Sequence, residues 1–163
     1  GAAPKPRASV DVPDVGPVAV SWRRSGSNTM VTLDWEKLLG RLPFRLPFCS
    51  AVIARDGTVH VSGSVPGRPG AGGTPEVIPG GPQAEAFKTM QIIDATLRAC
   101  GVSAADVTMV HVFLVDYTPE RFAAMNRGYL AFWGDRPLPA RICSGATHLG
   151  LGASVEIDVV AKV

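Results

Sequence analysis

An apolar, β-branched run in the second half of the chain constrains the fold more than any other feature. Residues 108–115 read Thr-Met-Val-His-Val-Phe-Leu-Val, a composition typical of a buried strand. Both alternating sides of this segment are apolar, so a sheet that contains it needs cover on both faces. We expect helices on one face and a second copy of the chain on the other, which predicts oligomerisation through the open face. Dimeric and trimeric assemblies both satisfy this argument.

Two amphipathic helices flank this strand along the chain. The first is expected over residues 83–100, where apolar residues recur at helical spacing: Phe87, Met90, Ile93 and Leu97. The second starts at Pro119 behind Thr118, a favourable capping residue. Its buried face is expected to carry Phe122, Met125, Tyr129 and Phe132.

The remaining strands complete an α+β fold, a mixed sheet with two helices packed on one face. Strands are expected at residues 50–54, 58–62, 138–144 and 154–163. Between the second strand and the first helix, residues 63–82 are rich in Gly and Pro and are expected to form a surface loop. The element order β-β-α-β-α-β-β supports this class.

The 163 residues suffice for one compact domain, expected over residues 46–163, with an N-terminal extension over residues 1–45. Residues 1–17 are rich in Pro, Ala and Gly, which indicates a flexible or extended arm. A small β-hairpin is expected next, with its strands at residues 18–22 and 29–33.

Composition argues against several classes of function. The net charge is only +2, and Arg23-Arg24 is the only basic pair, so nucleic acid is not an expected partner. The chain has no apolar run long enough to span a bilayer, so no membrane partner is expected. Its three cysteines, Cys49, Cys100 and Cys143, are an odd number without CxxC spacing. They favour a reducing compartment, the cytoplasm or an organelle after removal of a transit peptide.

Metal and nucleotide sites lack sequence support. The three histidines are widely spaced, and none stands with another residue at the spacing of a zinc site, so no metal is expected. The Gly-rich segment 63–82 lacks the Gly-Lys-Ser/Thr ending of a phosphate loop. We expect it to form a rim or lid over a site.

The last quarter of the chain holds the two residues that best suit anion chemistry. Arg141 follows Pro139-Ala140, and its guanidinium offers a planar fork for the carboxylate of a small ligand, although a surface ion pair gives the same pattern. Glu156 interrupts an apolar strand. It shares a face with Asp158, while Val155, Ile157 and Val159 share the other face. Glu156 suits the holding and polarising of a water molecule, Asp158 is the second choice, and a solvated strand face is the alternative.

Cys143 stands two residues after Arg141 and should point to the same face of a strand. It could line a ligand pocket, and packing as a small apolar residue is the alternative. A thiolate nucleophile is the least favoured interpretation, because no base pairs with Cys143 in the sequence.

Taken together, the segments from about Leu46 to Val163 resemble the Rid proteins, the YjgF-type reactive intermediate imine deaminases. The resemblance rests on residues 46–51, 59–63, 97–101, 110–116, 125–132, 139–141 and 155–161. It implies a chorismate-mutase-like fold and a homotrimer with clefts between subunits. It also implies hydrolysis of reactive 2-imino or enamine acids to 2-keto acids and ammonia, without a metal or organic cofactor.

The resemblance also implies roles for individual residues. Arg141 would bind the substrate carboxylate, and Glu156 would position the water molecule. Further pocket residues would be Asn126, Cys143, Ser62, Gly63 and Phe48.

The chain departs from the family pattern at several positions. Phe48 stands where the family usually has Tyr, and Glu85 and Ile92 replace the usual Gln and Asn of the first helix. The long segment 63–82 and residues 1–45 are additional. These departures keep two alternatives open, an imine- or enamine-handling enzyme of a specialised biosynthetic pathway and a ligand-binding protein without turnover. The scattered charge argues against the ribonuclease activity reported for some relatives.

Overall fold

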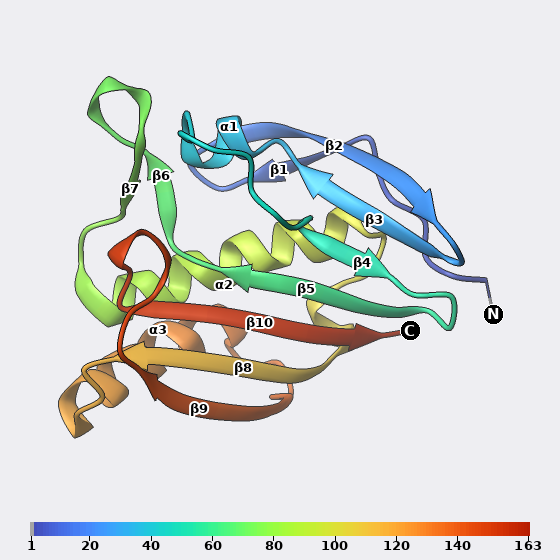
Figure 1. Cartoon of the computed structure of the whole chain (residues 1–163). Helices are drawn as coiled ribbons and strands as arrows, with labels where there is room; N and C mark the ends of the chain where they lie inside the picture. Colours follow the sequence, from blue (N-terminus) through green and yellow to red (C-terminus); the bar gives the residue numbers. More distant parts are fainter. Residues whose placement is uncertain (1) are drawn as a thin grey trace.

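The computed structural model describes residues 2–163 and has one large sheet with two long helices on one side of it (Figure 1). Eight strands follow the spatial order β1-β2-β3-β4-β5-β10-β8-β9. Their bounds are β1 Ser9–Val12, β2 Gly16–Ser25, β3 Asn28–Leu33, β4 Ala51–Ile53, β5 Thr58–Ser64, β8 Val107–Val115, β9 Ala140–Ala146 and β10 Val155–Lys162. Neighbours are antiparallel except β8 and β9, which are parallel. The predicted α+β class is confirmed.

The helices are α1 (Trp35–Leu39), α2 (Gly81–Ala99) and α3 (Pro119–Trp133). As predicted, Thr118 caps α3 by accepting a hydrogen bond from the backbone N–H of Arg121, and Pro119 stands in the first turn. No helix within residues 2–163 is both long and apolar enough to cross a membrane.

The two long helices meet at Gly128. A Cβ atom at this position would overlap the carbonyl oxygen of Gln83, so α2 and α3 approach more closely than any side chain allows. The buried stripe of α2 holds Met90, Ile93 and Leu97 as predicted, but Phe87 is 38% exposed. Ala86 occupies the buried position instead, because it lies four residues before Met90.

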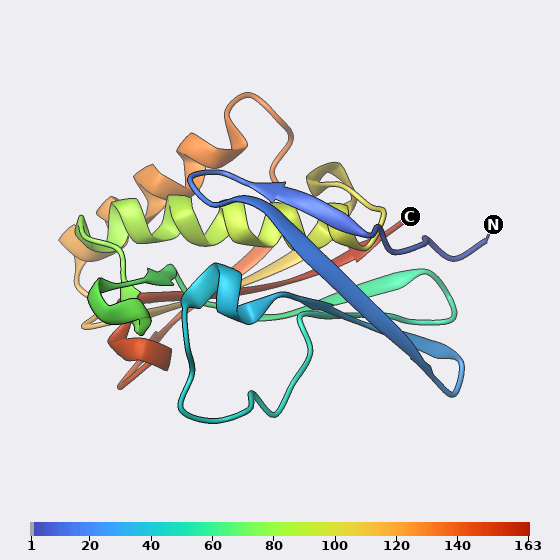
Figure 2. The same ribbon diagram turned by 90° about the horizontal axis from the view of Figure 1, so that it is seen from above.

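The N-terminal residues extend the sheet and curl it around α2. The predicted hairpin is confirmed as β2 and β3, and β3 continues the sheet by pairing with β4. Residues 1–17 were predicted to form a flexible or extended arm. From β1 onward the extended alternative holds and flexibility does not, since Val10 and Val12 are buried against the core. The backbone N–H of Arg7 also donates to the carbonyl of Ala99 at 2.8 Å. Figure 2 shows β1 lying beside α2.

Residues 63–82 are not a plain loop. β5 continues to Ser64, and β6 (Gly67–Pro69) and β7 (Pro75–Val77) form a separate two-stranded hairpin. The guanidinium of Arg68 bonds the carboxylate of Glu76 at 2.8 Å across this hairpin. Strands of three residues leave too little alternation for the sequence to reveal them.

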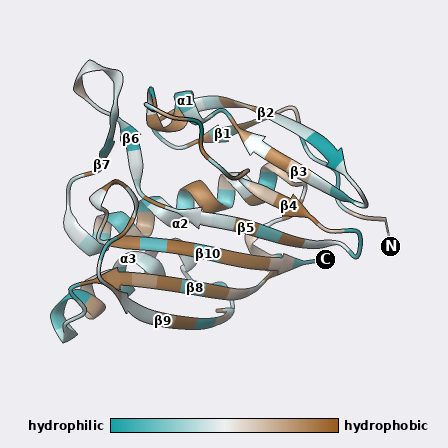
Figure 3. Cartoon of the chain, viewed as in Figure 1, coloured by the Kyte–Doolittle hydropathy of each residue, from teal (hydrophilic) through white to brown (hydrophobic). Residues whose placement is uncertain are grey.

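Strand β8, which contains the apolar run at residues 108–115, has one fully buried side. Val110, Val112 and Leu114 are completely buried under the helices, and the residues that alternate with them on β8 keep partial exposure. Figure 3 shows long hydrophobic stretches on β8, β9 and β10, and Ile142 of β9 is 53% exposed. The outer side of β8 therefore keeps apolar residues partly exposed next to Ile142, and the cover of this part of the open face by another copy of the chain stays a prediction.

Candidate functional site

A cavity of about 310 Å³ lies where the open face of the sheet meets the segment of residues 40–49. Figure 2 shows this segment, between α1 and β4, bulging from the sheet on the side away from the long helices. Four of the predicted site residues line the cavity: Phe48, Ser62, Gly63 and Glu156. Ile92 of α2, one of the departures from the family pattern, lines it as well. Residues far apart in the chain thus meet at one place.

Glu156 is the acidic residue in the lining of this cavity. It pairs with Phe113 of β8 and points to the open face, while Val155 and Ile157 on either side of it are completely buried. Partial burial, and then the nearby charge of Asp158, raise the pKa of the Glu156 carboxyl above its ordinary value. Within residues 2–163, no Lys, Arg or His nitrogen lies within 4 Å of this carboxylate. An unpaired carboxylate of raised pKa suits proton transfer at a bound water molecule.

Asp158, the second-choice carboxylate, is already engaged. Its Oδ1 atom lies 2.7 Å from Nδ1 of His111 on the neighbouring strand β8. Asp158 therefore holds an imidazole and influences Glu156 through its charge, which leaves Glu156 as the freer base.

Hydrogen bonds fix the walls around Glu156. The hydroxyl of Ser62 donates to the carbonyl of Cys49 at 2.7 Å, which ties the segment carrying Phe48 to β5. Gly63 lies close to Glu156, because a Cβ atom there would be 3.3 Å from Cδ of that side chain. On α2, the buried carboxylate of Glu85 accepts the backbone N–H of Ser154 at 2.8 Å. Glu85, which stands where the family usually has Gln, therefore anchors the start of β10.

Arg141, Cys143 and Asn126 lie elsewhere, beside α3 at the β9 edge. The guanidinium of Arg141 stands over the rings of Tyr129 and Phe122, 4.8 and 5.8 Å from their centroids. Cys143 packs against the core, and burial raises the pKa of its thiol while Arg141 opposes that shift. This burial effect speaks against a thiolate nucleophile.

Unpaired polar atoms gather on the helix next to Arg141. Within residues 2–163, three buried atoms lack a hydrogen-bond partner: Oδ1 of Asn126, the hydroxyl of Tyr129 and Nε1 of Trp133. All three lie on α3, and buried polar groups are usually satisfied. This region is therefore a second place where a polar ligand atom would find partners.

The structure does not bring Arg141 and Glu156 together within one chain. Arg141 pairs with Val110 on β8 and so lies on the helix side of the sheet, whereas Glu156 pairs with Phe113 and lies on the open side. A ligand that contacts both residues would have to lie between two copies of the chain.

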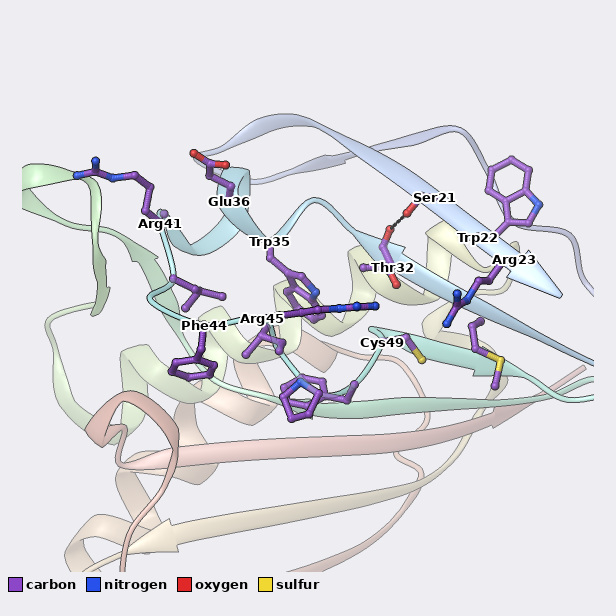
Figure 4. A pocket seen from close by; sticks show the side chains of 16 residues that line it. Ser21, Trp22, Arg23, Thr32, Trp35, Glu36, Arg41, Phe44, Arg45 and Cys49 are labelled. Carbon is purple, nitrogen blue, oxygen red and sulfur yellow. Dashed lines mark hydrogen bonds between the residues drawn. The ribbon is translucent and has the colours of Figure 1, made fainter. Parts of the chain in front are cut away.

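A larger cavity, of about 1270 Å³, adjoins the first and was not foreseen from the sequence. Its lining includes Arg23, Trp35, Phe44 and Arg45 (Figure 4). For this part of the chain the sequence predicted only a hairpin, with strands at residues 18–22 and 29–33. Only the concentration of arginine and aromatic residues before position 49 could have indicated a site. No group of three or more potential metal ligands occurs in the described part of the chain.

Comparison with known proteins gives a consistent result. The family model described as "Endoribonuclease L-PSP" matches residues 42–163, so β1, β2, β3 and α1 precede the match. The chain is 34% identical to RutC family protein UK114 of Drosophila melanogaster over 71% of this chain and 78% of that protein. It is 30% identical to 2-iminobutanoate/2-iminopropanoate deaminase of Capra hircus over 71% of this chain and 79% of that protein. The crystal structure of RidA from the Antarctic bacterium Psychrobacter sp. aligns with a TM-score of 0.63 at 27% identity, covering 77% of this chain and 94% of that chain.

Proposed function

Because the chain belongs to the endoribonuclease L-PSP family, the family of the Rid and RutC proteins, we propose that it hydrolyses reactive 2-imino or enamine acids to 2-keto acids and ammonia. The observation that carries this proposal is the half-buried, unpaired carboxylate of Glu156, which lines a cavity and has a raised pKa. The name of the goat relative, a 2-iminobutanoate deaminase, supports the same reaction class. The free cysteines fit a reducing compartment such as the cytoplasm.

We further propose that the working unit is a homotrimer whose sites lie between subunits. Arg141 of one subunit would meet Glu156 of the next, because the two residues occupy opposite sides of the sheet in one chain. The partly exposed apolar residues on the outer side of β8 and β9 would supply the contact between copies. The unpaired buried atoms beside Arg141 would gain partners in the cleft.

In this site each side chain has one task. The guanidinium of Arg141 binds the substrate carboxylate through two parallel hydrogen bonds and fixes the imine carbon in place. Glu156 accepts a hydrogen bond from a water molecule and orients its oxygen toward that carbon. Asn126, Tyr129 and the protonated Cys143 line the carboxylate end, and Phe48 covers the water end.

The reaction then needs only proton transfers. Water attacks C2 of the protonated imine as its proton passes to Glu156, which gives a 2-amino-2-hydroxy acid. The Glu156 carboxyl returns this proton to the amino nitrogen, the C–N bond breaks, and ammonia leaves with the bonding pair. The remaining hydroxyl loses its proton to solvent and becomes the keto group.

The test uses 2-iminobutanoate released in situ by a threonine dehydratase, with 2-oxobutanoate and ammonia measured. We expect Arg141→Ala to lower kcat/KM by about 10- to 100-fold, the effect of losing a charge-assisted pair of hydrogen bonds. Glu156→Gln should abolish most turnover, because an amide cannot take the proton. Arg24→Ala is the control, since Arg24 lines neither cavity and lies on β2, far from β9 in the order of the sheet. Unchanged activity in Arg141→Ala would remove this residue from the mechanism.

The second candidate is an imine- or enamine-handling step of a specialised pathway on the same scaffold. The observation in its favour is the large second cavity, with Phe48 in its lining where a tyrosine is usual. A larger substrate would need this space.

A further inference from the structure

The two cavities are direct neighbours, and we refer to them together as the trough. They share six lining residues: Trp35, Leu42, Phe44, Leu46, Pro47 and Phe48. Glu156 lines only the smaller cavity, whereas Arg23 and Arg45 line only the larger one. β2, β3 and α1 supply much of the larger cavity's wall, and they precede the residues that the family model matches.

The middle of the trough is apolar and aromatic. The rings of Trp35 and Phe48 meet edge to face with centroids 5.9 Å apart. Phe44 and Phe48 are 62% and 48% exposed, although aromatic side chains of this size normally bury most of their area. Exposed aromatic side chains gathered in a hollow indicate a surface that binds an apolar group.

The larger cavity, which Glu156 does not line, carries the guanidinium groups of Arg23 and Arg45. Figure 4 shows the side chains of Arg23 and Arg45 extending into the space between β2–β3 and residues 40–49. Neither guanidinium has a carboxylate within 4 Å in the part of the chain that the structure describes. Arg41 differs, since it turns away and donates to the carbonyl of Gly72 at 2.6 Å. The acid in this lining, Glu36, also points away from Arg23 and Arg45 in Figure 4.

We propose that the natural substrate is a 2-imino acid with a long apolar or aromatic side chain that ends in a second acidic group. This inference rests on the proposed function for the reacting end at Glu156. The apolar part of the substrate lies against Trp35, Phe44 and Phe48, and its terminal acid binds the guanidinium groups of Arg23 and Arg45. The small iminobutanoate would fill only the cavity at Glu156.

Calorimetric binding of the product 2-oxo acids tests this inference without requiring turnover. The ligands are 2-oxo diacids of increasing length, from 2-oxoglutarate to 2-oxosuberate, each compared with the 2-oxo monoacid of the same chain length. Affinity should rise with length for both series. At the length where the second acid reaches the arginines, the diacid should bind about tenfold more tightly than its monoacid.

Variants assign this preference to the two arginines. Replacing both, Arg23→Gln with Arg45→Gln, should remove the tenfold advantage of the diacid and leave monoacid binding unchanged. Arg24→Gln is the matched control, because Arg24 lies on the same strand but is absent from the trough and bonds the hydroxyl of Thr29. Equal affinities of diacid and monoacid at every length would overturn the inference. A diacid preference that survives the double variant would do the same.

Turnover of the corresponding imines separates the two proposals. Hydrolysis of 2-iminobutanoate without any preference for long diacids would leave the deaminase function standing and refute the trough. Arginine-dependent diacid binding without hydrolysis of any imine would refute the deaminase function and retain the trough as a binding site. Faster turnover of the long imino diacid than of 2-iminobutanoate, lost in the double variant, would support both.

Discussion

Replacement of Gly63 by Ala tests how closely the position of Glu156 controls the reaction. A Cβ atom at residue 63 would lie 3.3 Å from Cδ, 3.5 Å from Oε2 and 3.6 Å from Cγ of Glu156. Carbon atoms at rest are about 3.5–4.0 Å apart, so the carboxylate must shift by a few tenths of an ångström. Gly63 does not have a positive φ, so the backbone accepts alanine without strain. Stability should therefore change by no more than about 1 kcal/mol.

The rate should fall more than the stability. A displacement of about 1 Å at a catalytic group can cost about 100-fold, so a shift of a few tenths should cost about 3- to 10-fold in kcat/KM. The added methyl group also removes water from the carboxylate, which raises the pKa of Glu156 further. A base works in its deprotonated form, so activity is lost as the pH falls through its pKa. The acidic limb of the pH–rate profile should therefore move to higher pH.

The assay is the pH dependence of kcat/KM for imine hydrolysis, with thermal unfolding measured on the same samples. Gly145→Ala is the matched control, because its new Cβ atom would meet Tyr117 at an ordinary 3.5 Å and no atom of Glu156. If Gly63→Ala folds normally and keeps both the rate and the acidic limb of the native protein, Glu156 is not the base.

Two further substitutions have clear expected outcomes. Asp158→Asn removes the like charge that helps to raise the pKa of Glu156, so the acidic limb of the pH–rate profile should move to lower pH. If the acidic limb stays in place, Asp158 does not influence the pKa of Glu156. Burial, the larger cause, remains, so this pKa should stay above its ordinary value. Gly128→Ala places a methyl group on the carbonyl of Gln83 and forces α2 and α3 apart. Chemical denaturation should show a loss of about 3 kcal/mol or more, and a native midpoint would contradict the packing described for the two helices.

Much of the fold follows from local patterns in the sequence. The alternation from Val155 to Val159 correctly separated the buried side of β10 from the side that carries Glu156. Thr118 and Pro119 marked the start of α3, because a cap and a fixed φ act within one turn. Such signals need no knowledge of distant residues.

The parts that were missed depend on distant contacts. β1 has only four residues, and it is ordered by contact with α2, more than 60 residues later in the chain, which no local pattern reveals. The separation of Arg141 from Glu156 depends on the parallel pairing of β8 with β9 and the antiparallel pairing of β8 with β10. The trough likewise arises because residues 40–49 cross the open face next to β2 and β3.

The central claim is that Arg141 and Glu156 act in one site although they lie on opposite sides of the sheet. Mixing two inactive variants tests it most directly. Arg141→Ala and Glu156→Gln are unfolded together in equal amounts, refolded, and assayed for imine hydrolysis. In random assemblies each site takes its arginine from one subunit and its carboxylate from the next, so about one quarter of the sites should be intact.

We therefore expect about one quarter of the native activity from the mixture, and almost none from either variant refolded alone. The control for refolding is a mixture of the native protein with a double variant that carries both substitutions in one chain. The same fraction of its sites, about one quarter, should have both native residues. If the mixture of single variants stays inactive while this control recovers, the two residues do not form a shared site between subunits.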